Sequence, residues 1–67
     1  MFTIKYPEIE VALTGMDGNA FSVLAAVSGA LRRAGIDQAE RDTFHDEATS
    51  SDYDYLLQTA MRWVTVS

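Results

Sequence analysis

The sequence predicts a single small α+β domain with an N-terminal strand region, three helices and a short C-terminal strand. Apolar residues alternate along the first fourteen positions, which is typical of a half-buried strand. They recur every three or four positions in residues 20–34 and 51–64, which is typical of helices, and β-branched residues alternate again in 64–66. All 67 residues are expected to form one domain, because domains usually run about 100–150 residues.

The N-terminal strand region is expected over about residues 2–14, with an interruption near Pro7. Proline cannot donate a hydrogen bond to a neighbouring strand, so it marks an edge, a bulge or a break. The parity of the apolar positions changes across it, from Phe2, Ile4 and Tyr6 to Ile9, Val11 and Leu13. A bulge or kink is therefore predicted there, followed by a turn over residues 15–19 in which Asp17 or Asn19 caps the next helix.

Residues 20–34 predict a helix with hardly any charged face before Arg32 and Arg33. Its apolar stripe is Ala20, Leu24, Val27, Leu31 and Ala34, widened by Phe21 and Val23. Small residues fill much of the remaining surface, so this helix is either wrapped on most sides or meets a second copy of the protein. Gly35 fits the left-handed position after the helix, and Ile36 fits the apolar position of a Schellman closure.

A second helix is expected over about residues 38–48, with Asp37 as N-cap and Glu40 at the third helical position, a capping-box variant. It is strongly polar, and only Ala39, Phe44 and Ala48 can attach it to a core.

The third helix, over residues 51–64, is expected to begin with Ser51 as N-cap and Asp54 at its third helical position. Its predicted core stripe is Tyr53, Leu56, Leu57, Ala60, Met61 and Val64, with Tyr55 and Trp63 lying off it. The alternating residues 64–66 are expected to pair with the N-terminal strand.

No pattern in the chain predicts catalysis, a cofactor or a metal site. There is no cysteine, and His45 is the only histidine, with Asp42 and Arg41 one helical turn before it, whereas a zinc site needs three or four placed ligands. Neither a phosphate-binding Gly-x-x-x-x-Gly-Lys loop nor a Gly-x-Ser-x-Gly nucleophile elbow is present. We therefore expect a protein that is not an enzyme.

The sequence also predicts a cytoplasmic protein without membrane contact. No apolar run approaches the roughly 20 residues that cross a bilayer, and the N-terminus lacks the segments of a signal peptide.

Acidic residues are concentrated in one part of the chain. The net charge is −5, and residues 37–54 hold seven acidic residues against Arg41, a local charge of −6. Such a surface repels nucleic-acid phosphates and attracts basic partners. A helix-turn-helix regulator is disfavoured for the same reason, because Asp52 and Asp54 stand where the recognition helix would contact bases.

Three stretches of the sequence, 17–21 (DGNAF), 31–35 (LRRAG) and 51–57 (SDYDYLL), together with 61–64 (MRWV), resemble a family of short uncharacterised proteins of bacterial genomes, phages and plasmids. The resemblance covers most of the chain. It implies a mobile-element context, in which many small proteins are accessory or counter-defence proteins, and it implies no activity or catalytic residue.

Taken together, the sequence predicts a non-enzymatic module that binds a basic surface on a protein partner. In the mobile-element context, the partner is a host nucleic-acid-handling or defence complex, and the protein is an inhibitor such as an anti-CRISPR. The expected partner-binding residues, with Tyr55 as an apolar anchor, are Asp42, Asp46, Glu47, Asp52, Asp54 and Tyr55. The alternatives are a solvated acidic face, or a homo-oligomeric accessory protein that dimerises through the 20–34 helix, in which a bulky residue at Ala26 or Ala30 would abolish association.

Overall fold

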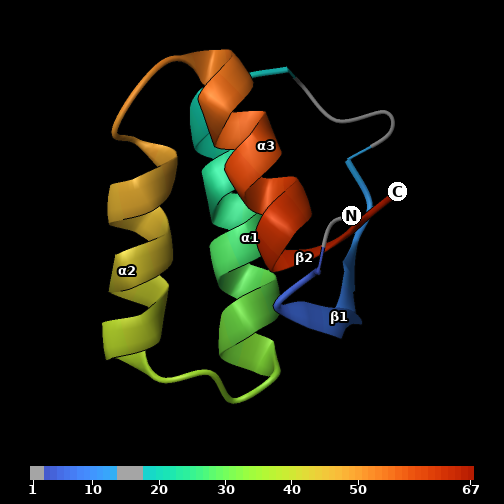
Figure 1. The fold of residues 1–67 in the computed structure, drawn as a ribbon. Coiled ribbons are helices and arrows are strands. Elements are labelled where there is room, and N and C mark those ends of the chain that lie inside the picture. Colours follow the sequence, from blue (N-terminus) through green and yellow to red (C-terminus); the bar gives the residue numbers. More distant parts are fainter. Residues whose placement is uncertain (1–2, 14–17) are drawn as a thin grey trace.

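The computed structural model describes residues 3–13 and 18–67 and has the predicted α+β architecture. The chain forms two strands and three helices (Figure 1), which in chain order are β1 (Tyr6–Val11), α1 (Ala20–Arg33), α2 (Gln38–Ala48), α3 (Tyr53–Trp63) and β2 (Val64–Val66). The two strands lie beside each other against the helices. None of the described helices is long and apolar enough to span a membrane.

β1 and β2 pair in parallel, as the two ends of a crossover made by all three helices. Tyr6 is opposite Val64 and Glu10 is opposite Thr65, so β1 advances four residues where β2 advances one. This irregularity is the bulge predicted near Pro7, and the Thr65 hydroxyl donates to the Pro7 carbonyl at 2.8 Å. The strand begins at Tyr6 rather than near residue 2; Phe2 and the greater part of the predicted 15–19 turn lie outside the described residues.

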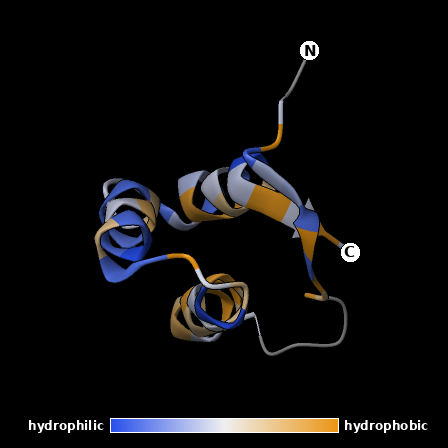
Figure 2. Cartoon of the chain, turned by 90° about the horizontal axis from the view of Figure 1, so that it is seen from below, coloured by the Kyte–Doolittle hydropathy of each residue, from blue (hydrophilic) through white to orange (hydrophobic). Residues whose placement is uncertain are grey.

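Every element contributes to one core. The fully buried side chains include Val27 and Leu31 of α1, Phe44 of α2 and Val64 of β2, and Trp63 of α3 is 4% exposed. The Phe44 and Trp63 rings meet edge to face, with their centroids 5.4 Å apart. Figure 2 shows α2 as the most hydrophilic helix, and it joins the core through Phe44 and Ala48, two of its three predicted apolar contacts, whereas Ala39 is exposed.

The apolar stripe of α1 is shifted from the predicted one. Ala30 is buried, Ala34 is exposed, and Phe21 points outward with 81% of its surface exposed. At about 100° per residue, Phe21 lies well outside the face of α1 that holds Val23, Val27 and Leu31, so its side chain meets solvent.

The Schellman closure that ends α1 is confirmed. Gly35 has a φ of 86°, and its N–H donates to the Arg32 carbonyl, while the Ile36 N–H donates to the Leu31 carbonyl at 3.0 Å.

The N-caps of α1 and α2 are confirmed, whereas that of α3 was predicted wrongly. Asn19 accepts a hydrogen bond from the Phe21 N–H, and Asp37 accepts one from the Glu40 N–H. In α3 the cap is Asp52 rather than Ser51: its carboxylate accepts from the Tyr55 N–H at 2.9 Å. The helix therefore begins one residue later than expected, and Tyr55, not Asp54, is its third residue.

The buried face of α3 also differs from the predicted stripe. Tyr53 is 39% and Met61 50% exposed, whereas Thr59 and Trp63 are buried. Thr59 can be buried because its hydroxyl donates to the Tyr55 carbonyl at 2.8 Å. α3 packs against α2 as well as α1, so its buried face extends to the side that carries Thr59 and Trp63.

Candidate functional site

Two of the predicted partner-binding residues, Asp42 and Asp46, share the outer face of α2. They are one helical turn apart, both are exposed, and they lie almost opposite the buried Phe44 on the helix. Helical geometry thus brings these two carboxylates together on a free surface, as the sequence predicts.

Asp52 and Asp54 stand at the start of α3, and both are exposed. α2 leads into α3 through the short segment 49–52, so these aspartates lie at the end of the molecule where α2 finishes (Figure 1). The carboxylate of Asp52 also caps α3. We call Asp42, Asp46, Asp52 and Asp54 the acidic surface.

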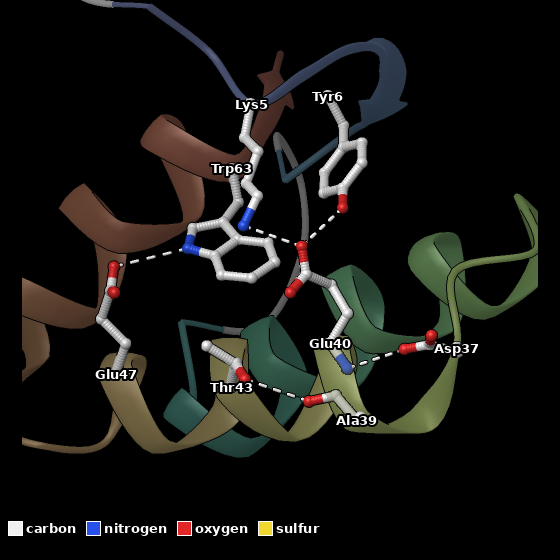
Figure 3. Close-up of polar contacts among 8 residues, drawn as sticks. All are labelled: Lys5, Tyr6, Asp37, Ala39, Glu40, Thr43, Glu47 and Trp63. Carbon is white, nitrogen blue, oxygen red and sulfur yellow. Dashed lines mark hydrogen bonds and ion pairs between the residues drawn. The ribbon is translucent and has the colours of Figure 1, made fainter.

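Glu47 and Tyr55 differ from these four aspartates, because both are half-buried and in contact with α3 side chains. The Glu47 carboxylate accepts from the Trp63 indole N–H at 3.4 Å (Figure 3) and lies 3.9 Å from an Arg62 terminal nitrogen. The Arg62 guanidinium lies 5.3 Å from the centroid of the Tyr55 ring. Arg62 thus connects Glu47 and Tyr55 along the seam between α2 and α3, at the border of the acidic surface.

The structure reveals a polar cluster that the sequence analysis missed, formed by Lys5, Tyr6, Glu40 and Trp63 (Figure 3). One oxygen of Glu40, Oε2, accepts from the Tyr6 hydroxyl at 2.6 Å and lies 2.7 Å from the Lys5 ammonium. The same ammonium lies 4.3 Å from the Trp63 ring centroid. The carboxylate expected to close a capping box therefore binds β1 and the residue before it. Tyr6 and Glu40 are 34 positions apart in the sequence, so no local sequence pattern predicts this contact.

The cluster shifts the ionisation of both partners. The hydrogen bond to Glu40, followed by desolvation, raises the pKa of Tyr6 from 10.0 to about 12. Hydrogen bonds from Lys5 and then Tyr6 lower the pKa of the Glu40 carboxyl below its usual 4.5. Glu40 is thus an ionised anchor that holds the start of β1 on α2.

The basic residues that form ion pairs contact other acids, not the four aspartates of the acidic surface. Among residues 3–13 and 18–67, the ion pairs are Lys5–Glu40 and Arg62–Glu47, and neither involves one of the four aspartates. In the same part of the chain, no group of three or more histidine and acidic side chains is arranged to hold a metal ion.

Comparisons of the chain with family models, curated proteins and solved structures gave no match. The resemblance to short bacterial and phage proteins stays a prediction.

Proposed function

We propose that this protein is a non-enzymatic binding module that presents its acidic surface to a basic surface of a protein partner. The observation that carries the proposal is the unequal use of carboxylates: Glu40 and Glu47 pair with cations inside the fold, while Asp42, Asp46, Asp52 and Asp54 have no ion pair among the described residues. Such uncompensated exposed charge attracts and orients an oppositely charged partner.

The spacing of the aspartates supports a surface that stands in for nucleic-acid phosphates. Asp42 and Asp46 are one turn apart along α2, and Asp52 and Asp54 extend the negative charge beyond its end. Glu47 and Tyr55 form the border of this surface, where the Tyr55 ring offers apolar contact. Combined with the mobile-element context that the resemblance implies, the sharpest form of the proposal is an inhibitor, such as an anti-CRISPR, that occupies the basic groove of a host nucleic-acid-handling complex.

The test is a pull-down from the native host with tagged protein, at low and at high salt. The informative variant replaces Asp42, Asp46, Asp52 and Asp54 with asparagine, which removes four charges and keeps a capping side chain at position 52. A partner with a basic groove should be recovered at low salt, lost at high salt because screening weakens exposed charges, and lost in the variant.

A matched control replaces Glu8 and Glu10 with glutamine, because these exposed acids lie on β1, away from the acidic surface. This control should retain the partner. Equal recovery of the partner by the four-aspartate variant and the native protein would contradict the proposal.

A second candidate function, homodimerisation through α1, is favoured by the exposure of Phe21. Phe21 is 81% exposed on a helix whose Ala25 is also exposed. The positions first expected to test it are unsuitable, because Ala30 is buried and Ala26 packs against the core. Recovery of only this chain in the pull-down, insensitive to salt and lost on Phe21→Ser, would support the dimer instead.

A further inference from the structure

A hollow between α1 and α2 is lined by Arg32 and Arg41, two of the three arginines that form no ion pair among the described residues. It has a volume of about 420 Å³ and is lined by Ser28, Arg32, Gln38, Arg41, Asp42 and His45. α1 and α2 lie side by side (Figure 1), joined by the short segment 34–37. The hollow therefore has one wall from each helix.

The two arginines of this hollow share its lining with one acid, Asp42, in a protein whose net charge is −5. Neither Arg32 nor Arg41 forms an ion pair within residues 3–13 and 18–67. The cations of the two ion pairs found there are Lys5 and Arg62. Arg41 donates from Nε to the Asp37 carbonyl at 3.4 Å, which orients its guanidinium and leaves the two terminal nitrogens to a ligand. Two like charges on facing helices repel each other, and an anion bound between them offsets that repulsion.

We propose that this hollow binds the phosphate group of a small molecule, with Arg32 and Arg41 on either side of it. Guanidinium groups form paired, charge-assisted hydrogen bonds to phosphate oxygens. The Ser28 hydroxyl, the Gln38 amide and the His45 ring add further donors around the same space. Asp42 is the one acid on the wall, and it accepts a hydrogen bond from a hydroxyl group of the bound molecule.

The surroundings favour a small phosphate compound over a nucleic acid. Asp42 lines the hollow and Asp46 is exposed one helical turn further along α2, so their carboxylates repel the further phosphates of a polynucleotide. A hollow of 420 Å³ falls within the roughly 300–1,000 Å³ of small-molecule sites. One phosphate group with a short hydroxylated body fits both the charge and the size.

The first experiment is a nuclear magnetic resonance titration of the isotope-labelled protein with inorganic phosphate, against sodium chloride at equal ionic strength. Saturable shifts should be confined to residues that line the hollow, with a Kd in the millimolar range. Shifts that chloride reproduces, or that spread evenly over the surface, would overturn the proposal.

Two variants and a matched control locate the site. Arg32→Gln and Arg41→Gln should each weaken phosphate binding by about tenfold, which corresponds to the loss of a charge-assisted hydrogen bond. Arg33→Gln makes the same charge change at the adjacent residue, whose guanidinium lies beside Gly29, outside the hollow. If Arg33→Gln weakened phosphate binding as much as Arg32→Gln does, the effect would come from the overall charge of the protein. That result would overturn the proposed site.

Asp42→Asn separates bare phosphate from a hydroxylated phosphate compound. Inorganic phosphate should bind more tightly to this variant, because a repelling charge is removed. The affinity for glycerol 3-phosphate should increase less, since the variant also loses the carboxylate that accepts a hydrogen bond from its hydroxyl group. An equal increase in affinity for the two compounds would contradict the proposed role of Asp42. If neither affinity increased, the anion would bind outside the hollow.

Discussion

At the scale of single residues, Glu40 shows how a local pattern can identify a residue and miss its role. The spacing from Asp37 correctly predicted that Glu40 would be the third residue of α2, because an N-cap depends on neighbours in the chain. Its carboxylate instead meets Lys5 and Tyr6, which only the folded chain brings near. The missed part of the candidate site is therefore its non-local part, and the same holds for the pairing of Glu47 with Arg62.

The Tyr6–Glu40 contact predicts a measurable tyrosine titration. The absorbance of tyrosinate, with Tyr6→Phe as the reference that assigns it, should give a midpoint for Tyr6 near pH 12. In Glu40→Gln this midpoint should move down toward 10.0, because the charged acceptor that favours the protonated phenol is gone. Glu47→Gln removes an acid that contacts Trp63 and Arg62 instead, and should leave it in place. A Tyr6 midpoint near 10 in the native protein would contradict the contact.

The same shifts set the sign of two pH dependences. The pKa of Tyr6 is higher in the folded state, so its contribution to the free energy of unfolding is full below pH 10.0 and is lost as the pH rises through about 12. The pKa of Glu40 is lower in the folded state, so its contribution is full above pH 4.5 and is lost as the pH falls through the folded value. Thermal unfolding across both ranges should show each loss diminished in Glu40→Gln.

At the scale of elements, the sequence predicted the existence and type of each helix better than the side of the helix that faces the core. Periodicity identifies a helix, but the residues at the edges of a stripe are decided by what packs against them. In α3, Trp63 and Thr59 face the core and Met61 faces solvent, because α2 covers the side on which the stripe was not expected. Likewise Ser51 and Asp52 are both good caps, and the pattern alone did not separate them.

The corrected cap of α3 predicts unequal effects of two neighbouring substitutions. Asp52→Ala should lower the free energy of unfolding by about 1 kcal/mol, because the Tyr55 N–H loses its acceptor. Ser51→Ala should change it by less than about 0.5 kcal/mol, as exposed positions away from a cap usually do. Urea unfolding followed by the fluorescence of Trp63 measures both. Asp52→Asn serves as control and should stay close to the native value, since asparagine caps equally well; a larger loss for Ser51→Ala would restore the cap first expected.

At the scale of the whole molecule, the sequence predicted the α+β class and the pairing of the first and last strands, but not their parallel direction. That direction follows from three helices making one crossover, a property of the assembled fold. The acidic stretch 37–54 was expected to form one face, yet packing divides it: its five aspartates stay exposed, while Glu40 and Glu47 turn to the cations of other elements. Charge along the chain predicts the sign of a surface, and packing decides which residues form it.

The last strand is predicted to be indispensable for cooperative folding. Val64 is fully buried, and burial of such a side chain contributes about 1.5–3 kcal/mol. Beyond Trp63 the chain also supplies the partners of the Leu13 N–H and the Val11 carbonyl, both at Ser67. The core of a domain of this size supplies only roughly 3–5 kcal/mol, so the loss removes most of the stability. A chain ending at Trp63 should therefore show no cooperative transition in urea.

Thr65→Ala in the full chain is the matched control for that truncation. It removes the hydrogen bond from the Thr65 hydroxyl to the Pro7 carbonyl and one half-buried methyl group, so the free energy of unfolding should fall by about 1 kcal/mol while the transition stays cooperative. If the truncated chain unfolded at the same urea concentration as the full chain, the helices would be stable by themselves. The two-stranded sheet would then be an attachment to the core rather than the element that closes it.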